Sequence, residues 1–146
     1  MPQMTRRVLL SALIVCLCSC AERDAGNHKV TVPVSGEVYV DGEPAAGVMV
    51  ICHDVKGVDK ENPTQSRADT DSDGVFQLST YKAGDGVPEG EYVLTFTWQK
   101  IDVMKRRPAG TDNLNDRYKD PAKSEFKVSV EEGEPIDLGR IDLTTK

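Results

Sequence analysis

The stretch EYVLTFTWQ, Glu91–Gln99, decides the fold of this chain. Apolar side chains occupy every second position, and the alternate positions after Val93 are polar. The apolar series is Tyr92, Leu94, Phe96 and Trp98, and the polar series is Thr95, Thr97 and Gln99. Since successive side chains of a β-strand point to opposite faces, this period of two predicts a strand with one buried face. The only tryptophan, Trp98, falls on the buried face and is predicted to be a core residue.

Five more segments repeat the alternation. They are VTVPVSGEVYV (30–40), GVMVICH (47–53), VFQLST (75–80), EFKVSVEE (125–132) and IDLGRIDL (136–143). Clusters of Gly, Pro and Asp separate them, and no segment has a convincing helical period. Pro33 cannot donate to a ladder, so the first strand should lie at an edge or bend there. The phase slip at Gly139 predicts a bulge. The chain is therefore predicted to be an all-β, immunoglobulin-like sandwich of about seven strands.

Two longer stretches carry a family resemblance. GEVYVDGEPAAGVMVICHD (36–54) and ADTDSDGVFQLSTYKAGDGVPEGEYVLTFTW (68–98) resemble the carboxypeptidase regulatory-like domains, which have a transthyretin-like fold. The resemblance covers about residues 34–98. With DRYKDPAKSEFKVSVEEGE (116–134), the chain looks like the small lipoproteins of this type from planctomycete bacteria. The resemblance implies an accessory or surface module with no catalytic residues.

The turn and core motifs have a physical basis. Gly74 is expected to adopt a positive φ after the acidic turn, which lets Phe76 enter the core. In immunoglobulin-like sandwiches, a tyrosine in the position of Tyr92 can fix a corner through its hydroxyl.

The N-terminus has the features of an export signal. Arg6 and Arg7 precede an apolar run that is about half the roughly 20 residues of a spanning helix. The exit LCSC (17–20) resembles the lipobox of bacterial lipoproteins, which implies cleavage before Cys20 and acylation of its thiol. Two alternatives stay open, namely an ordinary signal that leaves Cys20 as a free thiol, and export by the twin-arginine route. The predicted parts are a signal peptide at 1–19, a tether at 20–29 and a domain at 30–146.

Composition limits the location and the partners. Removal of residues 1–19 takes away two arginines and no acid, so the formal charge falls from −6 to −8. Nucleic acid would repel such a chain, and the acyl group rather than charge must hold it to a membrane. Besides Cys20, only Cys52 remains, so the domain has no disulfide framework. The predicted location is the cell envelope, on the periplasmic or outer-membrane face.

The acidic turn DTDSDG places Asp69, Asp71 and Asp73 at alternate positions before Gly74. This spacing resembles the first half of an EF-hand loop, in which such positions supply oxygen ligands. The twelfth position is Thr80 instead of a bidentate Glu, which excludes a full EF-hand. A weaker calcium site is one interpretation, and a tight turn between strands is the other. No other cofactor is predicted.

The tripeptide Cys52-His53-Asp54 contains the residue types of a nucleophilic triad. Because neighbouring residues of a strand face opposite ways, Cys52 and His53 are not expected to pair. No acid–base or nucleophile constellation remains, and the chain is predicted not to be an enzyme.

Two long connections, 54–67 and 100–123, are the candidate interaction loops. The second is basic, and its candidate binding residues are Lys105, Arg106, Arg107, Arg117 and Tyr118. The alternative is a solvated loop that Leu114 and Tyr118 anchor to the core. The sequence thus predicts a non-catalytic, lipid-anchored binding or structural module with an envelope protein as partner. The second hypothesis is a carbohydrate-binding module at the cell surface, with or without calcium.

Overall fold

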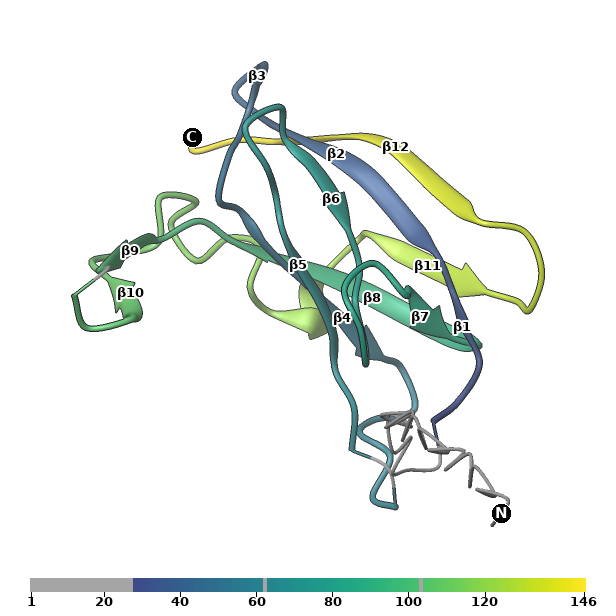
Figure 1. Ribbon diagram of the computed structural model, residues 1–146. Coiled ribbons are helices and arrows are strands. Elements are labelled where there is room, and N and C mark those ends of the chain that lie inside the picture. The colour runs from purple at the N-terminus through teal and green to yellow at the C-terminus, as the bar shows by residue number, and fades with distance from the viewer. Residues whose placement is uncertain (1–27, 62, 103) are drawn as a thin grey trace, which may run out of the picture.

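The computed structural model describes residues 28–61, 63–102 and 104–146 of the 146. Within this part the chain is all-β, with twelve strands and one short 3-10 helix (Figure 1). The elements are β1 (Thr31–Val32), β2 (Val34–Val40), β3 (Glu43–Pro44), β4 (Met49–Asp54), β5 (Ser66–Asp69), β6 (Val75–Gln77), β7 (Val87–Pro88), β8 (Gly90–Thr97), β9 (Lys100–Asp102), β10 (Arg107–Ala109), η1 (Pro121–Lys123), β11 (Lys127–Val130) and β12 (Ile136–Leu143).

Two sheets form the layers of a β-sandwich. The first has the order β12-β2-β3, with β6 also paired to β2, and the second has the order β11-β8-β4-β5. All pairs are antiparallel except β12 with β2, which run parallel. The predicted sandwich is therefore confirmed. The strand number differs from about seven because β1–β7 and β9–β10 form additional two-stranded pairs beside the layers.

The core lies between the two sheets and follows the predicted alternation, except that Thr95, on the opposite face of β8, is also buried. In β8 the side chains of Tyr92, Leu94 and Phe96 are buried, and Trp98, just after the strand, packs against the core while staying half-exposed. Its indole Nε1 donates to the Ala46 carbonyl at 3.0 Å, which explains why the ring sits at the rim with its polar edge partnered.

Proline and glycine act where the sequence predicts. The chain switches sheets at Pro33, since β1 pairs with β7 before it and β2 joins the main sheet after it. The register between β12 and β2 shifts between Asp137 and Arg140, which confirms the bulge at Gly139. Val30 departs from the prediction, because it precedes β1 and is exposed rather than buried.

Gly74 and Tyr92 also have the predicted roles. Gly74 has φ of 78°, and a Cβ there would lie 2.5 Å from the Val38 carbonyl oxygen. The Tyr92 hydroxyl donates to the Pro88 carbonyl at 2.9 Å, so it fixes the corner between β7 and β8. Among the described residues, no helix is long and apolar enough to cross a membrane.

Candidate functional site

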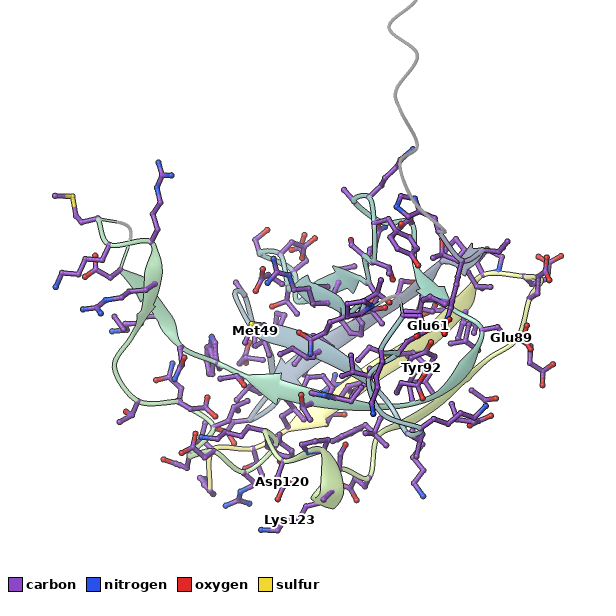
Figure 2. All side chains as sticks on the ribbon, turned by 90° about the horizontal axis from the view of Figure 1, so that it is seen from below. Met49, Glu61, Glu89, Tyr92, Asp120 and Lys123 are labelled. Atoms are coloured by element: carbon purple, nitrogen blue, oxygen red, sulfur yellow. The ribbon has the colours of Figure 1, made fainter. Side chains whose placement is uncertain are left out.

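A cleft of about 830 Å³ opens at one end of the sandwich, beneath the loop that joins β4 to β5. Its walls come from this loop, from the adjoining parts of β4 and β8, and from η1. They include His53, Asp54, Val58, Tyr92 and Ala122. The labelled Tyr92, Glu61 and Glu89 mark this region in Figure 2. The cleft is the first candidate site.

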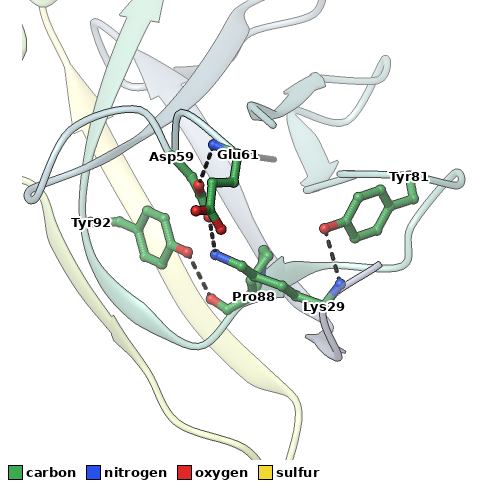
Figure 3. A network of polar contacts seen from close by, with 6 residues as sticks. All are labelled: Lys29, Asp59, Glu61, Tyr81, Pro88 and Tyr92. Atoms are coloured by element: carbon green, nitrogen blue, oxygen red, sulfur yellow. Dashed lines mark hydrogen bonds and ion pairs between the residues drawn. The ribbon is translucent and has the colours of Figure 1, made fainter. Parts of the chain in front are cut away.

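Figure 3 shows a polar network beside the cleft, which Lys29 and Asp59 also line. Lys29 Nζ lies 2.7 Å from Asp59 Oδ2, and the Glu61 amide donates to Asp59 Oδ1 at 2.9 Å. The Lys29 amide donates to the Tyr81 hydroxyl at 3.2 Å, and the His28 ring stacks on Tyr81 with centroids 4.1 Å apart. The hydrogen bond and the charge of Asp59 raise the pKa of Lys29. This network fastens the start of the described chain to the 55–65 loop.

This network was not predicted from the sequence, in which His28 and Lys29 were assigned to the tether. In the structure both residues contact the domain. An ion pair between Lys29 and Asp59 joins segments thirty residues apart, and only their spatial proximity reveals it. The one sequence signal was that Asp59 lies in a long connection already chosen as a candidate.

The Cys52-His53-Asp54 tripeptide lies at the cleft, and its geometry confirms that Cys52 and His53 face opposite ways. Cys52 is buried, and burial, with a smaller effect of Asp54, raises the pKa of its thiol to about 12. His53 Nε2 lies 2.8 Å from Thr95 Oγ1 on the outer face, and partial burial lowers the pKa of its imidazole. Asp54 Oδ1 accepts from the Lys56 amide at 2.7 Å. A protonated thiol with no base beside it does not act as a nucleophile.

The second candidate site is a hairpin arm, defined here as residues 100–110 and built on β9 and β10. The sequence predicted a loop in this region, but in the structure Lys100–Asp102 pairs with Arg107–Ala109 in an antiparallel ladder. Figures 1 and 2 both show the arm standing away from the two sheets. The side chains at its tip are exposed, namely Met104, Lys105, Arg106 and Arg107.

Local contacts hold the tip in shape. The Lys105 amide donates to Asp102 Oδ1 at 3.0 Å, and the Lys105 ammonium lies 3.7 Å from Asp102 Oδ2. Arg106 adopts a positive φ of 49°, which turns the chain back into β10. The arm carries Lys100, Lys105, Arg106 and Arg107 against Asp102, a formal charge of +3 on a chain of formal charge −6.

Arg117 and Tyr118 do not join the basic tip. Tyr118 is half-buried, its ring packs near Phe126 at 6.2 Å between centroids, and its hydroxyl accepts from the Thr144 amide at 3.1 Å. The Tyr118 carbonyl accepts from the Phe96 amide at 3.0 Å, and Leu114 is completely buried. Leu114 and Tyr118 therefore anchor this segment to the core, as the alternative interpretation predicts. Arg117 is exposed beside the anchor.

The acidic turn makes hydrogen bonds of its own. Asp71 Oδ1 accepts from the amides of Asp73 and Val75, each at 2.9 Å. Asp69 ends β5 with an exposed side chain. No group of three potential metal ligands occurs in the described part of the chain, and a calcium site at Asp69, Asp71 and Asp73 stays a prediction. Cys20, the predicted lipidation site, lies outside the described residues.

The comparisons with known proteins show likeness only at the level of the fold. No protein-family model and no curated sequence matches the chain. The major pilin subunit of Bacillus cereus is 15% identical with a TM-score of 0.45, over 78% of this chain and 30% of the pilin chain. The dioxygenase domain of a dioxygenase and carbohydrate-binding protein fusion from a cellulolytic Streptomyces is 19% identical with a TM-score of 0.40, over 82% of each chain.

Catechol 1,2-dioxygenase from Pseudomonas arvilla is 15% identical with a TM-score of 0.37, over 83% of this chain and 54% of that one. This chain thus spans less than a third of the pilin subunit and about half of the catechol dioxygenase. Similarity this weak transfers no function. The resemblance to carboxypeptidase regulatory-like domains stays a prediction from the sequence motifs.

Proposed function

We propose that this protein is a non-catalytic, lipid-anchored module of the cell envelope that binds an envelope protein through the hairpin arm. The main observation that supports this proposal is the hairpin arm, which is basic and projects from an otherwise acidic β-sandwich. A projecting hairpin contributes little to the core, so its residues are available for a partner. The lipobox-like LCSC sequence and the resemblance to accessory surface domains support the envelope location.

The charge of the arm indicates the chemistry of the partner. Guanidinium groups form paired hydrogen bonds with carboxylates, and Arg106 and Arg107 are adjacent at the exposed tip. Met104, whose side chain is 93% exposed, adds a flexible apolar contact next to them. We infer a protein surface that is acidic around a small apolar patch. Complementary charge of this kind speeds association and makes binding sensitive to salt.

The test is in-cell crosslinking of the tagged protein with its signal sequence intact, followed by pull-down and mass spectrometry. The test variant changes Lys105, Arg106 and Arg107 to Ser. The matched control changes Lys119, Lys123 and Lys127 to Ser, which removes the same charge from exposed positions near η1. One reproducible protein partner lost only with the arm variant supports the proposal. A partner retained by the arm variant, or lost equally with the control, contradicts it.

The carbohydrate-binding hypothesis makes a different prediction. A sugar-binding face of the stacking type needs an exposed aromatic ring, and none of the Phe, Tyr and Trp side chains among the described residues is fully exposed. Tyr39 lies beneath the Arg140 guanidinium at 3.8 Å, and Tyr81 stacks on His28. This hypothesis stays a prediction from the sequence. Recovery of glycan instead of protein in the pull-down would favour carbohydrate binding over binding to an envelope protein.

A further inference from the structure

Three exposed valines lie in two segments that reach the same end of the sandwich, namely the start of the described chain and the loop from β4 to β5. Among the described residues, the exposed large hydrophobic side chains are Val30, Val55, Val58 and Met104. Val30 follows Lys29 and Val58 precedes Asp59, so the Lys29–Asp59 ion pair brings these two valines to the same end. Val55 lies at the base of the same loop. We call the surface formed by Val30, Val55 and Val58 the valine face.

Backbone contacts hold the loop that carries Val55 and Val58. The Val55 amide donates to the Glu91 carbonyl at 2.9 Å, and the Gly57 amide donates to the Asp54 carbonyl at 3.0 Å. Gly57 adopts a positive φ of 90°, which tightens the turn. The valines are thus displayed on a loop whose backbone is fixed at its base. Val58 remains 71% exposed.

The charge around the valine face differs from that of the whole chain. The charged residues of the two segments that carry the valines are Lys29, Lys56, Lys60, Asp54, Asp59 and Glu61, and their formal charges cancel. Glu89, which lines the neighbouring cleft, adds one negative charge. A surface with so little net charge on an acidic protein limits repulsion from anionic headgroups. Exposed lysines beside apolar side chains also suit the interface of a bilayer, where the ammonium groups can reach the lipid phosphates.

The route of the chain identifies a lipid surface as the occupant. If Cys20 is acylated, eight residue steps separate the lipid from His28, a reach of at most about 29 Å. This reach is shorter than the roughly 35 Å width of a domain of this size. Lys29 contacts both Tyr81 and Asp59 (Figure 3), and His28 stacks on Tyr81. The described chain therefore begins at the end of the domain that carries the valines. The end that meets the bilayer first is therefore the end that carries the valines.

We propose that the valine face docks on the bilayer and orients the domain, so that the acyl group is not its only membrane contact. Val55 and Val58 enter the boundary between headgroups and acyl chains, and Lys56 and Lys60 lie at the level of the phosphates. The hairpin arm, which projects from a different part of the sandwich, stays in the aqueous phase (Figure 1). This inference rests on the lipid anchor of the proposed function.

The test measures depth in the membrane at two positions of the acylated full-length protein. Val58→Cys and Met104→Cys are each labelled with an environment-sensitive nitrobenzoxadiazole dye, while Cys52 is buried and Cys20 carries the lipid. The proteins are reconstituted in vesicles of phosphatidylethanolamine and phosphatidylglycerol with or without brominated acyl chains. Met104 is the matched control, since it is also an exposed hydrophobic residue on a turn but belongs to the arm.

The expected result is loss of fluorescence in brominated vesicles for the dye at position 58 and none for the dye at 104. Adding Val55→Asp to the labelled Val58 variant should reduce that loss, because it places a charge on the face. Equal quenching at both positions, or none at either, overturns the inference while the anchor stands, provided that the protein floats with the vesicles. If the acylated protein does not float with them, the anchoring proposal fails and this inference falls with it.

Discussion

Replacing Tyr92 by Phe removes a single hydroxyl and tests the corner that joins β7 to β8. The hydroxyl donates to the Pro88 carbonyl at 2.9 Å, and both residues are buried. A typical intramolecular hydrogen bond contributes about 0.5–1.5 kcal/mol net, and a buried acceptor left without its donor costs about 1–3 kcal/mol. Since the substitution strands the Pro88 carbonyl, we expect a loss of about 1–3 kcal/mol. Burial raises the pKa of Tyr92 to about 12, so its hydroxyl remains a donor at neutral pH.

Urea unfolding followed by tryptophan fluorescence and by circular dichroism measures this loss as a shift of the midpoint at constant m-value. The matched control is Tyr39→Phe, which removes a hydroxyl that has no hydrogen bond among the described residues from a ring covered by Arg140. We expect the control to change the free energy of unfolding by less than about 0.5 kcal/mol. A Tyr92→Phe effect no larger than that of the control would refute the corner as a stabilising contact.

Three other predictions concern the turn, the C-terminus and the core thiol. Gly74→Ala should destabilise the fold more than Gly42→Ala. Both glycines have a positive φ, but only a Cβ at position 74 would lie within 4 Å of a backbone carbonyl. Thermal unfolding of the two variants measures this difference. Hydrogen bonds from Thr145, and to a smaller extent from Thr144, lower the pKa of the Asp41 carboxyl. The ionised carboxylate therefore stabilises the fold at a pH above its unfolded pKa, and this stabilisation is lost as the pH falls through the folded pKa. Asp41 has a positive φ of 52°, which Asn tolerates better than Ala, so Asp41→Asn is the variant to compare. The stability difference between wild type and Asp41→Asn should begin to shrink as the pH falls below about 4, and a difference that stays constant in acid would contradict this contact. Cys52 should resist iodoacetamide at pH 8 in the folded protein and react after denaturation, as read by mass spectrometry, since burial raises its pKa to about 12; rapid native labelling would show that the core is open.

Local patterns in the sequence predicted most of the fold. The alternation from Tyr92 to Trp98 specified which face of the strand is buried, because side chains along a strand have a period of two whatever their neighbours are. Pro33 and Gly139 marked a break and a bulge for equally local reasons, namely a missing amide donor and a permissive backbone. The turn at Gly74 and the hydroxyl of Tyr92 were predictable because their partners lie within the same short motif or corner.

Those local patterns did not predict the contacts between segments that are distant in the sequence. Residues 100–123 read as one basic loop, yet the fold divides them into a projecting hairpin and an anchored segment. Lys105–Arg107 thereby separate from Tyr118, which belongs to the core. The parallel pairing of β12 with β2, the Lys29–Asp59 ion pair and the cleft beneath the 55–65 loop depend on how the two sheets are brought together.

The sequence by itself determined an acidic, all-β chain, because composition and a period of two act residue by residue. Tertiary structure alone decided which charged and apolar side chains share a surface. Such a surface is assembled from strand ends and loops that are far apart along the chain. The basic arm and the valine face became visible only when packing placed the first at a projecting turn and the second beside the start of the domain.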